Sequence, residues 1–165
     1  MKKTFTPEIS PEQYLQLITD RFVSAGDPFR AEQQSAYMKH QFDYCGLGAP
    51  QWMAMAKDFF ATHGMYTGKQ LEQFVRLCYD QEYREIQYVG LDMMQRMLPH
   101  QNKSWIRVLE KCITTNSWWD TVDWLAKLVG IHFKRFPELQ HKYAYKWIET
   151  DHMWLQRVAI IHQLT

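Results

Sequence analysis

Hydrophobic residues recur along this chain at intervals of three or four positions, and no stretch alternates apolar and polar residues for long. A spacing of three or four places the apolar side chains on one face of an α-helix, whereas alternation would indicate a β-strand. The pattern therefore predicts an all-α protein in which each helix turns an apolar face toward a common core.

Residues that favour helix ends divide this pattern into separate segments. The first helix is predicted after Ser10, because Pro11 suits a first helical turn and Gln13 can complete a capping box. Gly26 is predicted to end it. The later helices are predicted to start near Asp27, Pro50, Thr67, Tyr83, Asn102, Ser117, Pro137 and Asp151.

These predicted starts recur at a nearly constant spacing. One set lies at Pro50, Tyr83, Ser117 and Asp151, which are 33 or 34 residues apart, and the intervening helices start at Thr67, Asn102 and Pro137, 35 residues apart. Two helices in about 34 residues are typical of α-solenoids of the HEAT or TPR type. The spacing therefore predicts a single domain over residues 1–165, a right-handed α-solenoid of HEAT-like helical pairs. A plain helical bundle is the alternative.

The most unusual stretch is 117–124, which holds three tryptophans and two aspartates in eight residues. Ser117 is predicted to be the N-cap of a helix and Asp120 its third residue, where a carboxylate meets free backbone N–H groups. Asp123 lies beyond the capping positions and has no such role. The core-facing stripe of this helix is predicted to consist of Trp118, Val122, Leu125 and Val129.

Asp123 follows Trp119 by four residues, so their side chains are neighbours on one face of the predicted helix. A carboxylate beside an indole ring attracts cations, because the anion and the ring quadrupole both favour positive charge. The alternative is purely structural. Asp123 would then pair with Lys127, four residues later, and Trp119 would be one more wall of the core.

Composition is compatible with a folded protein that also exposes aromatic rings. Hydrophobic residues make up 46% of 165 residues and aromatic residues 15%, which suits one domain with a sizeable core. The polar start indicates no signal peptide, and no apolar run is long enough to span a membrane. Three cysteines, Cys45, Cys78 and Cys112, are widely spaced and are predicted to be reduced core residues of a cytoplasmic protein. The seven histidines lack the spacing of metal ligands.

The net charge of +1 is distributed unevenly along the chain. Residues 1–102 hold 10 Lys and Arg against 12 Asp and Glu, whereas residues 103–165 hold 9 against 6. The more basic segment contains the tryptophan-rich stretch. This asymmetry weakly favours a polyanionic partner, although solvated helix faces often produce the same bias.

The stretch 117–123 resembles the AlkD-type DNA glycosylases, which are bacterial alkylation-repair enzymes built from HEAT-like repeats. Four further stretches fit the same family in the same order: Ala-Tyr-Met-Lys at 36–39, Leu-Asp-Met-Met at 91–94, Lys-Trp-Ile at 146–148 and Trp-Leu-Gln-Arg at 154–157. The resemblance spans nearly the whole chain. Its most specific elements are Trp-Trp-Asp-x-Val-Asp and Trp-Leu-Gln-Arg.

The resemblance implies a role for four residues. Asp123 is expected to be the essential carboxylate, and Trp119 is expected to line the lesion site as the second member of the catalytic pair. Arg157 is expected at the DNA backbone near the lesion, and Tyr37 near the same surface. The implied reaction is hydrolysis of the N-glycosidic bond of N3- or N7-alkylated purines, such as 3-methyladenine and 7-methylguanine, without base flipping.

The resemblance also implies the partners and the setting. The partner is double-stranded DNA with alkylated purines, and no metal, cofactor or membrane is required. A full-length member is expected to be a monomer in the bacterial cytosol or nucleoid. The alternative function is a non-catalytic HEAT-like module that binds DNA or protein; the presence of both Trp119 and Asp123 favours the enzyme.

Members of this family usually continue for further repeats beyond the position that corresponds to Thr165. The last predicted helix, at 151–162, is strongly apolar, whereas the terminal unit of a solenoid is expected to have a polar outer face. We therefore expect that C-terminal repeats are missing here or that the helix is covered by self-association. The missing repeats would supply another lesion-facing tryptophan.

Overall fold

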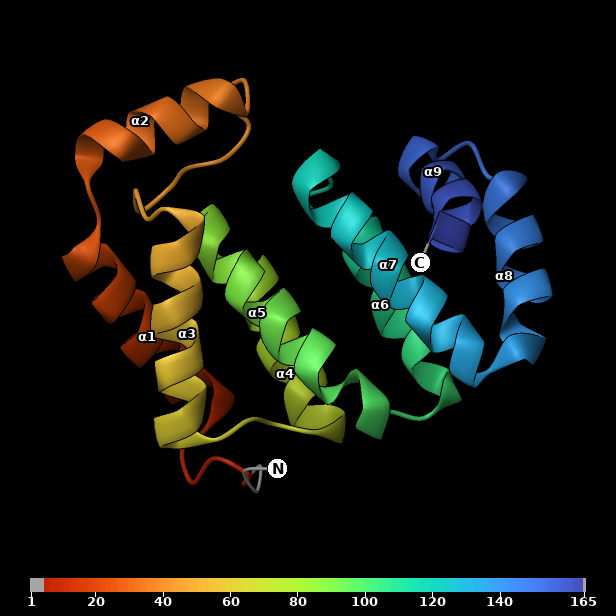
Figure 1. The fold of residues 1–165 in the computed structure, drawn as a ribbon, viewed down its shortest axis with the longest axis horizontal. Helices are drawn as coiled ribbons and strands as arrows, with labels where there is room; N and C mark the ends of the chain where they lie inside the picture. The colour runs from red at the N-terminus through yellow and green to blue at the C-terminus, as the bar shows by residue number, and fades with distance from the viewer. Residues whose placement is uncertain (1–4, 165) are drawn as a thin grey trace. The chain divides into compact units, whose positions relative to one another are not determined.

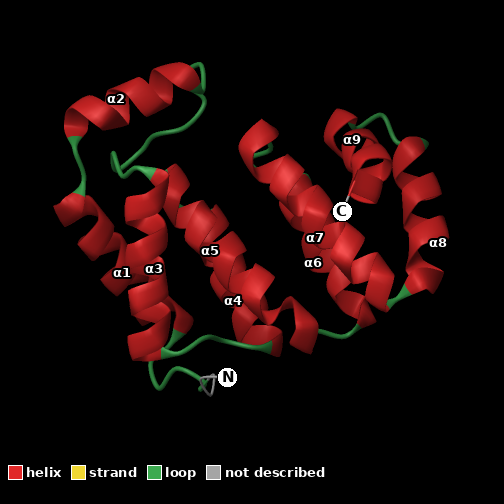
Figure 2. Cartoon of the chain, in the orientation of Figure 1, coloured by secondary structure: helices red, strands yellow, loops and turns green. Residues whose placement is uncertain are grey.

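Residues 5–164 are the part of the chain that the computed structural model describes, and all of their regular secondary structure is helical (Figure 2). Within this range no strand forms, and an isolated bridge joins Asp43 to Tyr83. The prediction of an all-α protein is thereby confirmed. None of the described helices is long and apolar enough to cross a membrane.

The chain divides by its internal contacts into two units, and the N-terminal unit extends to Met97. Its helices are α1 (Pro11–Ala25), α2 (Pro28–Tyr37), α3 (Ala49–His63), α4 (Gly68–Tyr79) and α5 (Arg84–Met97). Helix α4 packs against α5 and α1, and α3 packs against α1 and α5 (Figure 1). Tyr14 lies in the core of this unit, where its ring contacts Phe59 and Phe74 edge-on and its hydroxyl donates to the carbonyl of Gly64 at 2.9 Å.

The C-terminal unit begins at Leu98. After two short 3₁₀ turns (Leu98–His100 and Lys103–Trp105) come α6 (Ile106–Ile113), α7 (Trp119–Arg135), α8 (Pro137–Ile148) and α9 (Met153–Ile161), and a last 3₁₀ turn spans His162–Leu164. Helix α7 packs against α6, α8 and α9 (Figure 1). Trp147 of α8 is fully buried, and its indole N–H donates to Glu110 at 2.8 Å.

The helices repeat with the period that the sequence predicts. Alternate helices begin at Ala49, Arg84, Trp119 and Met153, which are 35, 35 and 34 residues apart. Consecutive helices of a unit pack side by side, as α4 does with α5, α6 with α7 and α8 with α9. The fold is therefore an α-solenoid of helical pairs.

Several predicted helix starts differ from the observed ones by one to four residues. The largest difference is at Asn102, which caps the 3₁₀ turn Lys103–Trp105, whereas α6 begins at Ile106. Ser117 is not the N-cap of α7: Trp118 occupies that position without a capping hydrogen bond, and Asp120 is the second helical residue instead of the third. The Ser117 hydroxyl instead donates to the carbonyl of Ile113 at 2.5 Å, where α6 ends. It therefore satisfies a free carbonyl of the preceding helix. Similarly, α9 begins at Met153 and not at Asp151.

The three cysteines, Cys45, Cys78 and Cys112, are buried and free, as predicted. Burial, together with the nearby carboxylates of Glu85 and Glu82, raises the pKa of the Cys45 thiol to about 12. Because the thiolate is the reactive form of cysteine, this residue is a packing residue at neutral pH.

The capping box of α1 predicts a measurable stability difference. Ser10 Oγ accepts from the backbone N–H of Gln13 at 3.2 Å, and the Gln13 side chain accepts from the N–H of Ser10 at 3.1 Å. Thr67 is the N-cap of α4 but its side chain makes no capping bond. Ser10→Ala should therefore lower the free energy of unfolding by about 1 kcal/mol, and Thr67→Ala by much less. Urea denaturation monitored by circular dichroism tests this; equal losses for the two variants would contradict it.

Candidate functional site

Trp119 and Asp123 lie on the exposed face of α7, one helical turn apart. The opposite face is buried, since Val122, Leu125 and Val129 have no exposed surface. This confirms most of the predicted core stripe and turns the other side of the helix toward solvent. The exposed fraction is 48% for Trp119 and 47% for the Asp123 side chain, so both are accessible to a large partner.

Arg157 of α9 completes the cluster. Its Nε and Nη2 atoms donate to Asp123 Oδ1 at 2.7 Å and Oδ2 at 2.9 Å, which is a two-pronged ion pair. The hydrogen bond to Asp123 raises the pKa of the Arg157 guanidinium above its ordinary value. The guanidinium carbon also lies 4.5 Å from the ring centroid of Trp119, a cation–π distance. Anion, cation and indole thus form one contiguous group between two helices.

Trp154 supports this group, and the sequence reasoning assigned it no role. Its ring meets Trp119 edge-to-face with centroids 4.8 Å apart, and the ring of Trp118 lies 6.2 Å away. Trp154 precedes Arg157 by three residues on α9, so both side chains project from one face of that helix. This spacing is the signal that could have identified it.

The two structural alternatives for this stretch are wrong. Asp123 gives both carboxylate oxygens to Arg157 and does not pair with Lys127. Trp119 is half-exposed, so it is not a core residue. The pairing with Arg157 holds the carboxylate in a defined direction without burying it.

Tyr37 ends α2 in the N-terminal unit, and 86% of it is exposed. The contacts that join Trp119, Asp123 and Arg157 all belong to the C-terminal unit. The predicted place of Tyr37 near the same DNA surface stays a prediction, as do the roles of the other three residues.

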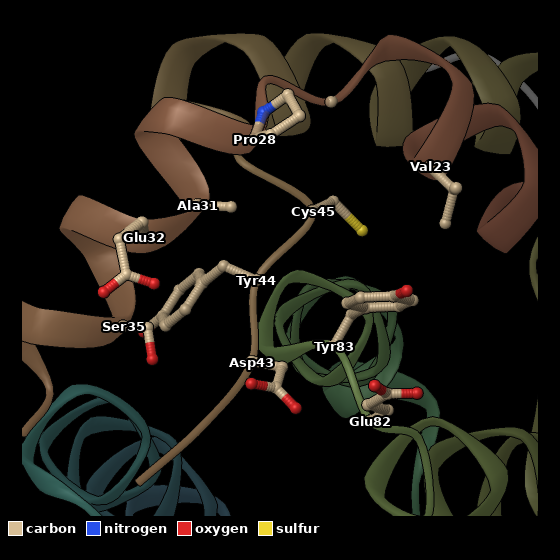
Figure 3. Close-up of a pocket in the computed structure, with 11 residues that line it drawn as sticks. Val23, Pro28, Ala31, Glu32, Ser35, Asp43, Tyr44, Cys45, Glu82 and Tyr83 are labelled. Carbon is tan, nitrogen blue, oxygen red and sulfur yellow. The ribbon is translucent and has the colours of Figure 1, made fainter. Parts of the chain in front are cut away.

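A cavity of about 470 Å³ in the N-terminal unit is a separate feature (Figure 3). None of the four predicted site residues lines it. Its wall includes the carboxylates of Glu32, Asp43 and Glu82 and the rings of Tyr44 and Tyr83. Among residues 5–164 no lysine or arginine lines it. Three carboxylates without a cation repel a phosphate backbone. We therefore do not assign this cavity to the candidate site.

The net charge of the unit that holds the cluster is more favourable to a polyanion. From Leu98 onward the sequence holds 9 Lys and Arg against 6 Asp and Glu, so the C-terminal unit is net positive. Among residues 5–164 no group of three or more His, Cys, Asp or Glu side chains could hold a metal ion. The cluster itself offers a carboxylate, a guanidinium and aromatic rings.

Comparison with known proteins identifies the family of this chain. A family model for DNA alkylation repair enzymes matches residues 18–165. A solved structure of a predicted DNA alkylation repair enzyme from Enterococcus faecalis is similar, with a TM-score of 0.76 and 26% sequence identity, over 85% of this chain and 66% of that one. Curated protein sequences give no match. The solved structure shares the fold of this chain, and the family model shows that the chain belongs to the DNA alkylation repair enzyme family.

Proposed function

We propose that this protein is a DNA glycosylase that hydrolyses the N-glycosidic bond of N3- and N7-alkylated purines, such as 3-methyladenine and 7-methylguanine. Its family supports a repair role. The observation that carries the finer proposal is the half-exposed carboxylate of Asp123 beside the indole of Trp119. The carboxylate, whose direction is held by Arg157, and the indole ring both lie where a cationic lesion can reach them.

Cleavage of the N-glycosidic bond of such a purine needs little acid catalysis. A purine alkylated at N3 or N7 is cationic, so it is already a good leaving group. As its bond to C1′ opens, positive charge develops on the deoxyribose. The carboxylate of Asp123 can stabilise that charge and orient the attacking water, as carboxylates do in glycoside hydrolysis.

Trp119 adds a second cation-stabilising element. In the free protein its ring contacts the guanidinium of Arg157. A cationic sugar or base could contact the ring face in the same way, for about 0.5–2 kcal/mol. Trp154 packs against the Trp119 ring in an edge-to-face contact and would keep that ring in position.

Arg157 can bind a phosphate without leaving Asp123. A guanidinium has five N–H donors, and the ion pair with Asp123 uses two of them. The remaining donors can contact a backbone phosphate, which would position the strand without reading its sequence. This keeps Arg157 at the DNA backbone, as the family resemblance implies, while it also orients the carboxylate.

The exposed position of the cluster favours excision without base flipping. Most glycosylases enclose the extruded base in a pocket. Here the carboxylate and the indole are each about half exposed, so they can approach a lesion that stays at the duplex surface. We therefore expect bulky cationic adducts to be accepted and neutral lesions to be left intact.

The test is direct. The protein, in excess over a duplex with one 7-methylguanine, should release free 7-methylguanine faster than the protein-free duplex does, as measured by chromatography. A duplex with a neutral lesion is the matched control and should stay intact. Binding of the duplex without release would reject the glycosylase and favour a non-catalytic DNA-binding module. Absence of both binding and release would favour a protein-binding module.

A further inference from the structure

Lys127 is an unpaired cation on the same ridge of α7 as the candidate site. Trp119, Asp123 and Lys127 follow one another at intervals of four residues, so they lie on three successive turns of one helix face. All three are exposed. Among the described residues no carboxylate lies within ion-pair distance of the Lys127 ammonium.

Its lack of a partner follows from the position of Arg157. An aspartate followed four residues later by a lysine is a favourable arrangement for a helix ion pair. Here Arg157 occupies both oxygens of Asp123, although it comes from another helix. The ammonium of Lys127 is therefore left without a carboxylate partner. The Cβ atoms of Lys127 and Asp123 are about 5–6 Å apart on the helix surface.

We propose that Lys127 binds a phosphate of the DNA strand close to the lesion and so positions the damaged nucleotide against Asp123 and Trp119. This rests on the proposed function, because it assigns a positioning residue to the same site. An exposed ammonium on a flexible stem suits a phosphate, since it acts as a point charge that needs no fixed geometry. Ile131, one turn further along the ridge, carries no charge that would compete with the phosphate.

The two cations of the site would then have different tasks. Arg157 is held by Asp123 and by the ring of Trp119, so its direction is set by the protein. Lys127 has no such restraint and can follow the backbone of the bound strand. The contact would be the same for damaged and undamaged DNA, because phosphates carry no sequence information.

The experiment compares Lys127→Gln with Lys111→Gln. Lys111 is a matched control, because it is an exposed lysine of the same unit, on α6. Within residues 5–164 no ion pair involves it. Both variants lose one positive charge, and melting curves would show that both are folded. Affinity for an undamaged duplex is measured at several KCl concentrations, which also gives the salt dependence of binding.

We expect Lys127→Gln to weaken binding about 3- to 10-fold at low salt and to reduce the slope of log K against log[salt] by about 1. Lys127→Arg should restore most of the affinity, and Lys111→Gln should match the wild type. Equal effects of the two glutamine variants, or an unchanged slope for Lys127→Gln, would overturn the inference. Weaker binding by Lys127→Gln alone would support the phosphate contact even if the wild-type protein released no base. The experiment therefore tests the contact independently of the proposed reaction.

Discussion

Asp123→Asn should slow the release of 7-methylguanine by at least about 100-fold, because it removes the charge that stabilises the developing cation and keeps the shape of the side chain. The substitution also removes the partner of Arg157, whose two hydrogen bonds to the carboxylate are 2.7 and 2.9 Å long. The guanidinium would then have all five of its donors available for phosphate, so duplex affinity should be retained or increased. Single-turnover release and duplex affinity are measured on the same samples.

The control for this variant is Asp120→Asn, which makes the same change of charge three residues earlier on α7. Asp120 lies in the first turn of the helix, where its carboxylate favours the helix N-terminus. Its loss should reduce stability slightly and leave the rate of release within a few-fold of the wild type. The proposed role of Asp123 is wrong if the two asparagine variants release base at the same rate.

Glu85→Ala should strongly destabilise the N-terminal unit. The Glu85 side chain is fully buried, and its carboxylate accepts from the backbone N–H groups of Cys45, Gly46 and Leu47 at 2.9, 3.0 and 3.1 Å. These three groups belong to the segment that joins α2 to α3. Without the carboxylate all three buried donors lose this acceptor, and we expect the free energy of unfolding to fall by about 3–5 kcal/mol.

Glu82→Ala is the matched control for this stability effect. Glu82 carries the same charge three residues earlier, but it is exposed. Among the described residues its side chain makes no hydrogen bond to the backbone. Its removal should change the free energy of unfolding by less than about 0.5 kcal/mol. Urea denaturation followed by circular dichroism measures both variants. A loss below about 1 kcal/mol for Glu85→Ala would show that water or a shifted loop replaces the carboxylate.

The sequence predicted the features of the fold that depend on neighbours within a few residues. The capping box of Ser10 and Gln13 formed as expected, because both partners lie within one turn of the same helix. The predicted spacing of the helix starts was also confirmed, because each start depends on residues close to it in the sequence. The prediction for Ser117 was wrong for the opposite reason. Its hydroxyl donates to the carbonyl of Ile113 at the end of the preceding helix, and the local sequence does not show whether a serine will make that bond or cap the next helix.

The candidate site also has one feature set by local spacing and one set by long-range packing. Helical spacing alone placed Trp119 beside Asp123 and left two possible partners for the carboxylate, a lysine four residues away or none. Only the packing of α9 against α7 decided between them, because it brings Arg157, 34 residues later in the chain, to the carboxylate and the indole. Contacts between helices depend on how their apolar faces pack, and that packing is a property of the whole unit. The sequence therefore specified which side chains share a helix face, and the tertiary structure specified which of them meet across helices.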